Sequence, residues 1–228
     1  MVGQNHKWES KLWSYVCSGD GMHCPVINEC EARRTGNWCA DDHSDKLRQL
    51  LDSDDQFDPT SYDFREPRDG MIFPVVEKLA EKLLKKGNIS SLPIPIELIS
   101  LADEKRPVEV RVLRLKACHA AIWRLNDVWL IQLADHCSSA RNKLTLFHEA
   151  FHILAHCCCN STPAFEKRGS KQGSFNELLA DYFSMCVLMP REWVRVKWAE
   201  VEHIDKMAET FEVPKSTMWF RLRELSLV

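Results

Sequence analysis

The sequence has no long hydrophobic run and no recognisable export signal. Its longest apolar stretch, "CVLM" at residues 186–189 with its neighbours, is far shorter than the roughly 20 residues that a membrane-spanning helix needs. The first residues, "MVGQNHKWESKLWSYVCSGDG", do not combine a basic start with an apolar core, as a secretory signal peptide would. These absences predict a cytoplasmic protein without a membrane segment.

The sequence also lacks a strong charge of either sign, internal repeats and low-complexity tracts. The net charge of the 228 residues is -3, with 45% hydrophobic and 28% charged residues. The net charge therefore gives no indication that nucleic acid or acidic lipid is a partner. The length suits one core of ordinary size with an appendage.

Cysteine is the residue type in excess. Ten cysteines occur, and four of them form a C-x6-C-x5-C-x8-C array near the N-terminus: Cys17, Cys24, Cys30 and Cys39. Without an export signal, clustered cysteines favour metal binding over disulfides. The array could hold a structural Zn²⁺, in which His23 or His43 could substitute, or an iron–sulfur cluster. Reduced cysteines in a small apolar subdomain are the third interpretation.

Composition divides the chain into four parts. Residues 1–51 are the cysteine-rich extension, and residues 52–70 form an acidic, proline-containing linker. Apolar periodicity predicts helices over 71–87, 140–156, 174–189 and 191–201, and a short helix entered through Pro95 within 91–104. Alternation predicts a strand over 107–115 and a hairpin over 120–133. Residues 71–200 thus read as one α+β domain with a small sheet. Residues 201–228 read as two short helices that resemble a helix-turn-helix.

One helical stretch contains the pattern H-E-x-x-H, formed by His148, Glu149 and His152. Residues four apart share one helix face, so both imidazoles can bind one Zn²⁺. Glu149, beside them, can take a proton from a zinc-bound water. His156 continues the stripe but is two turns, about 12 Å, from His148, which makes it a poor candidate for the same ion.

The third ligand is expected from the segment "FNELLADYF". Glu177 and Asp181 are four apart and therefore project from one face of a helix. Glu177 can bind zinc, and Asp181 can accept the second N–H of a ligand histidine, which fixes its tautomer. The nearby run Cys157–Cys159 points in three directions on a helix, which favours apolar filling over a metal site, with a redox role as the alternative.

Three segments together resemble the ImmA/IrrE family of metallo-endopeptidases: "RNKLTLFHEAFHILAH", "NELLADYFSMCVLMP" and the C-terminal "MAETFEVPKSTMWFRLRELSLV". Arg141 and Thr145 match the arginine and threonine that precede H-E-x-x-H in the family. The family's Glu-x-x-Ala-Asn has Asp181 in place of asparagine here, an arrangement similar to that of thermolysin-like enzymes. Phe151 stands where the family usually has glycine.

The resemblance implies a zincin-like, mainly helical metallopeptidase that cleaves a helix-turn-helix repressor or an antitoxin-like partner. Zn²⁺ would be held by His148, His152 and Glu177, with Glu149 as general base. Tyr182 could donate to the peptide oxyanion or equally pack in the core. The alternative is a non-catalytic, metal-binding regulator that binds a protein partner or DNA.

The C-terminal helices place Lys215–Arg223 where a recognition helix would lie. A DNA-binding helix should show a basic face, but residues 201–228 contain four Lys/Arg and five Asp/Glu. The apolar positions Met218, Trp219, Leu222 and Leu225 suit packing against the preceding domain. The sequence therefore favours packing or protein recognition over direct DNA binding.

Overall fold

The structure is a computed structural model that describes residues 72–115, 119–125, 127–158 and 171–228. The cysteine array Cys17, Cys24, Cys30 and Cys39, His23, His43, the acidic linker and Cys159 lie outside the described residues. Whether the N-terminal cysteines hold zinc, a cluster or no metal therefore stays a prediction.

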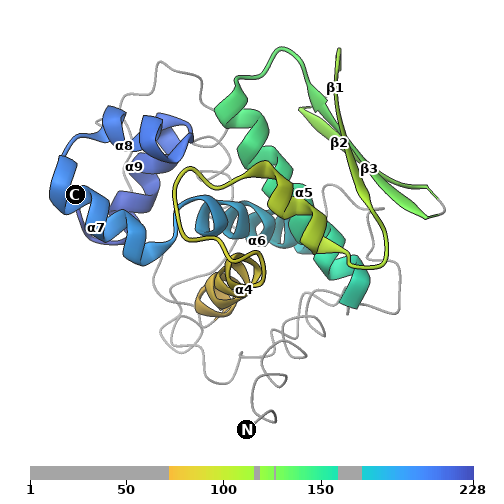
Figure 1. Cartoon of the computed structure of the whole chain (residues 1–228), viewed down its shortest axis with the longest axis horizontal. Coiled ribbons are helices and arrows are strands. Elements are labelled where there is room, and N and C mark those ends of the chain that lie inside the picture. Colours follow the sequence, from red (N-terminus) through yellow and green to blue (C-terminus); the bar gives the residue numbers. More distant parts are fainter. Residues whose placement is uncertain (1–71, 116–118, 126, 159–170) are drawn as a thin grey trace, which may run out of the picture.

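The described part is mainly helical, with one small sheet (Figure 1). The elements follow in the order α4 (Ile72–Lys86), η2 (a 3₁₀ helix, Ile96–Ala102), β1 (Val108–Leu113), β2 (Ala120–Leu125), β3 (Val128–Ala134), α5 (Ser139–Cys158), α6 (Lys171–Leu188), α7 (Arg191–Val201), α8 (Ile204–Phe211) and α9 (Lys215–Glu224). The prediction of an α+β fold with a mainly helical domain is confirmed.

The sheet has the strand order β1-β3-β2. The predicted hairpin is present, because β2 pairs with β3 in antiparallel fashion from Ala120–Leu133 to Leu125–Val128. β1 pairs with β3 in parallel. Trp129 of β3 is buried, and its indole N–H donates to Asp103 just after η2 at 2.9 Å. This bond ties the central strand to the helical part.

Helices α5 and α6 form the centre of the core. α5 packs against α6, η2 and β3, and α6 also packs against α4. Phe147 and Phe151 of α5 are fully buried, and the Phe151 ring lies 5.6 Å from that of Phe183 in α6. The second half of α6 and the residue after it, Leu179 to Met189, are buried, except for Asp181, which is partly exposed. A helix that is apolar all round must lie inside the domain.

Gly87, which follows the first helix, has a packing role. Gly87 follows α4, but the left-handed conformation belongs to Asn88, with φ 51°. A Cβ atom at position 87 would lie 2.4 Å from Leu98 Cδ1. A side chain at position 87 would therefore make Leu98 shift where the end of α4 approaches η2.

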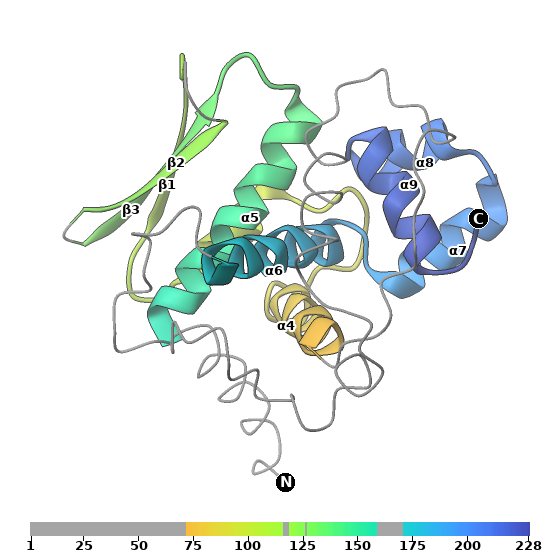
Figure 2. The same cartoon turned by 180° about the vertical axis from the view of Figure 1, so that it is seen from behind.

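The last three helices lie together at the end of the molecule opposite the sheet, as both views show (Figures 1 and 2). Six residues of α9 are buried: Ser216, Thr217, Met218, Phe220, Arg221 and Leu222. Lys143 of α5 is buried and bonds Glu212, between α8 and α9, at 2.6 Å. This burial favours the packing interpretation of the C-terminal helices over a recognition helix that enters a DNA groove.

Among the described residues, no helix is long and apolar enough to cross a membrane.

Candidate metal centre

The two histidines of H-E-x-x-H converge on one point beside α5. The Nε2 atoms of His148 and His152 lie 3.1 Å apart, and the ring centroids are 4.9 Å apart. Two nitrogens bound to one Zn²⁺ at about 2.0–2.1 Å in tetrahedral geometry would be about 3.3 Å apart. The pair thus fits a divalent metal ion without a change of helix geometry.

Asp181 of α6 holds the far side of the His148 ring. Its Oδ1 lies 2.5 Å from Nδ1 of His148, and both side chains are partly exposed. With Asp181 ionised, the Nδ1–H donates to the carboxylate, which leaves the Nε2 lone pair directed toward His152. The structure therefore brings together a histidine pair and an orienting carboxylate from two helices.

Glu149 is a buried carboxylate next to this pair, with 7% of its surface exposed. It lies in the same turn of α5 as His148, between the buried Phe147 and Phe151. A buried carboxylate beside two candidate ligand nitrogens is a candidate proton acceptor.

Glu177 lies in α6, one helical turn before Asp181. Its side chain is outside the described part, as are those of His156, Cys157 and Cys158. The spacing of four residues still predicts that Glu177 shares the helix face of Asp181. Its role as third ligand stays a prediction.

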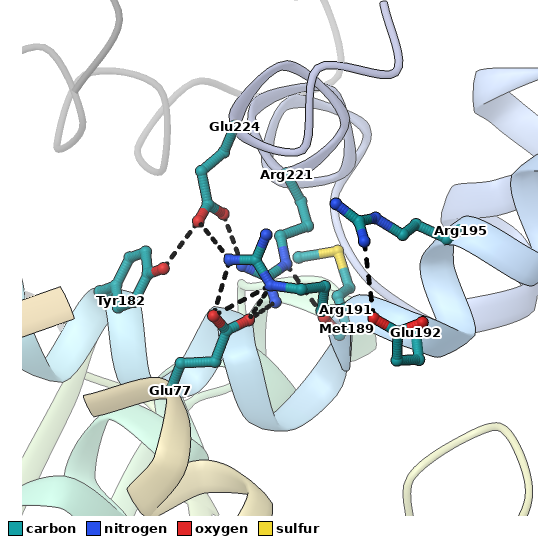
Figure 3. A network of polar contacts seen from close by, with 8 residues as sticks. All are labelled: Glu77, Tyr182, Met189, Arg191, Glu192, Arg195, Arg221 and Glu224. Carbon is teal, nitrogen blue, oxygen red and sulfur yellow. Dashed lines mark hydrogen bonds and ion pairs between the residues drawn. The ribbon is translucent and has the colours of Figure 1, made fainter. Parts of the chain in front are cut away.

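Tyr182 takes part in a polar network at the C-terminal helices (Figure 3). It is buried, packs on Phe73 at a ring distance of 4.7 Å, and donates its hydroxyl to Glu224 at 2.7 Å. Burial, with a smaller contribution from the neighbouring thiol of Cys186 and the carboxylate of Glu224, raises the pKa of Tyr182 well above its ordinary value. This placement favours a packing role for Tyr182 over an oxyanion donor.

Two arginines and two glutamates form the centre of that network. Arg221 of α9 is fully buried; it donates to Glu77 of α4 at 2.6 Å, to Glu224 at 2.5 Å and to the carbonyl of Met189 at 3.0 Å. Arg191 of α7 binds Glu77 through Nε at 3.1 and 3.2 Å and through Nη2 at 2.7 Å. Burial alone would raise the pKa of Glu77, but the hydrogen bonds and charges of the two arginines hold it below its ordinary value. The network joins α4, α6, α7 and α9.

A second group of metal-binding side chains escaped the sequence reasoning. His119, His136 and Cys137 come together where β2 begins and β3 ends, with one ligand atom of each within 4.8 Å of the others. The signal was available, because a hairpin centred on residues 126 and 127 brings residues 119 and 134 opposite each other.

A family model described as "IrrE N-terminal-like domain" matches residues 103–223, which is more than half of the chain. No curated protein matches the chain.

Among solved structures, a Mycobacterium tuberculosis transcriptional regulator has a similar fold, with a TM-score of 0.52 at 15% sequence identity. The match covers 78% of this chain and 51% of that one, so this chain spans about half the length of the regulator.

The family match includes α5 with its H-E-x-x-H, α6 with Asp181 and most of α9 with Arg221. It therefore agrees with the resemblance that those same segments carry in the sequence. The chain belongs to the IrrE N-terminal-like family, the metallopeptidase-related group that the sequence resembles.

Proposed function

We propose that this protein is a zinc-dependent endopeptidase with a regulatory role inside the cell. The observation that carries the proposal is the convergence of His148 and His152, with Nε2 atoms 3.1 Å apart, beside the buried carboxylate of Glu149. A purely structural metal site has no need of a buried acid that is not a ligand. Asp181, on Nδ1 of His148, supports the same interpretation.

His148 and His152 would hold the metal ion, and Glu177 is the expected third protein ligand. Zn²⁺ in such a site supplies Lewis acidity and a water molecule of lowered pKa. Glu149 would accept a proton from the attacking water and donate it to the leaving amine. Asp181 would keep the His148 ring in the tautomer that leaves Nε2 free to bind.

The substrate class follows from the family resemblance: a helix-turn-helix repressor or an antitoxin-like protein. The similar solved structure is that of a transcriptional regulator, which is compatible with a role in the control of gene expression. The alternative is a metal-binding regulator without peptidase activity. Phe151 stands where relatives usually have glycine, but its ring is fully buried against Phe183 and does not decide between the two functions.

Glu149→Gln tests the proposal. We expect the purified, zinc-loaded variant to keep its zinc and its fold, while hydrolysis of a denatured protein substrate falls about 10²- to 10⁴-fold, the usual contribution of general acid–base catalysis. Glu192→Gln is the matched control, because Glu192 is an exposed carboxylate of α7, and its rate should equal that of the wild type.

Two results would separate the alternatives. Hydrolysis that is absent in the wild type as well, with zinc bound, would favour the non-catalytic regulator. In cells, a regulatory effect that survives Glu149→Gln but is lost in His148→Ala would also show that the function needs the metal and not proteolysis.

A further inference from the structure

The sheet end that faces the start of α5 carries a cluster of soft and borderline metal ligands. His119 precedes β2, and His136 and Cys137 follow β3, immediately before α5. One ligand atom from each residue lies within 4.8 Å of the other two. The two imidazole centroids are 6.0 Å apart and the rings are inclined at 53°.

The backbone fixes this proximity. The N–H of Ala134 donates to the carbonyl of His119 at 2.9 Å, which continues the ladder of β2 and β3 by one residue. The N–H of Asp135 donates to the carbonyl of Leu113 at 3.0 Å, so β1 holds the same corner from the other side. The three ligand residues therefore project from backbone that is bonded to both neighbouring strands.

The side chains can close on an ion without moving this backbone. Tetrahedral Zn²⁺ with bonds of about 2.0–2.1 Å to nitrogen and about 2.3 Å to sulfur separates its ligand atoms by about 3.3–3.6 Å. The distances of up to 4.8 Å thus need a closure of about 1 Å. His119 and His136 are exposed and Cys137 is half-buried, so rotation about their side-chain bonds can supply it.

We propose that His119, His136 and Cys137 form a second Zn²⁺ site, which pins the β2–β3 hairpin to the start of α5. Two imidazoles and one thiolate suit zinc, whereas magnesium and calcium prefer oxygen ligands. Three protein ligands leave the fourth position to water, so this site exchanges its metal more readily than a closed four-ligand site.

The site is separate from the candidate catalytic centre. His148 lies nine residues into α5, about 14 Å along the helix axis from Ser139. One ion cannot reach both groups. The proposal does not depend on peptidase activity, because its test counts bound metal.

The test uses the full chain with His148→Ala and His152→Ala as the parent, so that the candidate catalytic centre binds no metal. In this parent, Cys137→Ser, His136→Ala and His119→Ala are each compared by zinc equilibrium dialysis and by cobalt(II) spectroscopy. Matched controls are His203→Ala, at an exposed histidine, and Cys186→Ala. Burial raises the pKa of Cys186 to about 12, which keeps it a thiol rather than a ligand. Circular dichroism of the metal-free proteins checks that each variant folds.

We expect each of the three site variants to lose one tightly bound equivalent of zinc relative to the parent, and both controls to lose none. Of the two cysteine variants, Cys137→Ser should weaken the thiolate-to-cobalt charge-transfer band. Cys186→Ala should leave this band unchanged. Zinc should also raise the melting temperature of the parent more than that of the site variants. Equal zinc content in folded parent and site variants would overturn the proposal. So would a loss confined to Cys137→Ser, since both imidazoles must take part.

Discussion

Neutralising Glu77 should destabilise the whole protein, because its carboxylate balances a fully buried arginine. Arg221 has 0% of its side chain exposed and is 2.6 Å from Glu77. Glu224, at 2.5 Å, is the second carboxylate of the network, and Arg191 is the second guanidinium. Glu77→Gln therefore leaves two positive charges against one negative charge at the junction of α4, α6, α7 and α9.

The expected magnitude follows from the partners that remain. Removing one partner of a buried ion pair typically costs about 3–5 kcal/mol. Glu224 still faces Arg221, the Met189 carbonyl still accepts a bond, and Arg191 is about one-third exposed, which reduces the loss of the Glu77–Arg191 pair. We therefore expect the lower end of that range, a fall of about 3 kcal/mol in the free energy of unfolding.

Chemical denaturation in urea, followed by tryptophan fluorescence and circular dichroism, measures this change. Glu192→Gln is the control in the neighbouring helix: Glu192 faces Arg195 at 3.6 Å and is largely exposed (Figure 3). Its substitution should change the free energy of unfolding by less than about 0.5 kcal/mol. If the two variants lose the same small amount, the network is solvated and the assignment of a buried charge cluster is wrong.

Two further predictions concern the pH dependence of this network and the orientation of His148. The pKa of Glu77 lies below its ordinary value of 4.5, so its stabilisation is present above pH 4.5 and is lost as the pH falls through the lower pKa of the folded state. The difference in unfolding free energy between wild type and Glu77→Gln should therefore shrink on acidification. A difference that grows would contradict the lowered pKa of Glu77. Asp181→Ala should weaken zinc binding about 10- to 100-fold by competition with a fluorescent chelator, while Asp127→Ala, at an exposed carboxylate away from both proposed zinc sites, should not change it. An unchanged zinc affinity in Asp181→Ala would contradict the orienting role.

Local periodicity was sufficient for the elements and for part of the candidate site. The spacing of four residues in α5 put His148 and His152 on one face, and their Nε2 atoms meet at 3.1 Å. Asp181 was placed by the periodicity of α6 alone, and its contact with His148 depends on how two apolar helices pack. The chemistry of the site predicted this contact without the packing, because a ligand histidine needs an acceptor for its second N–H.

Pairings over long distances along the chain were beyond such reasoning. Glu77 and Arg221 are separated by 144 residues, and in the sequence each looks like an ordinary charge on an amphipathic helix. A count of charges over 201–228 says nothing about which of them is buried. The parallel pairing of β1 with β3 could not be predicted from the local sequence either, because the alternation of residues within a strand does not identify the strand beside it.

Helix α6 connects the candidate metal centre to the C-terminal helices, and this gives the Glu77 substitution a second readout. Asp181 bonds His148 of α5, and the next residue, Tyr182, bonds Glu224 of α9. Successive residues of a helix differ by about 100° in direction, so the two contacts leave α6 on different sides. Glu77→Gln weakens only the side of α6 that faces α7 and α9. Under native conditions its zinc affinity should therefore equal that of the wild type, despite the lower free energy of unfolding. A parallel loss of zinc affinity would mean that the network sets the position of α6, and hence that the C-terminal helices control the metal centre.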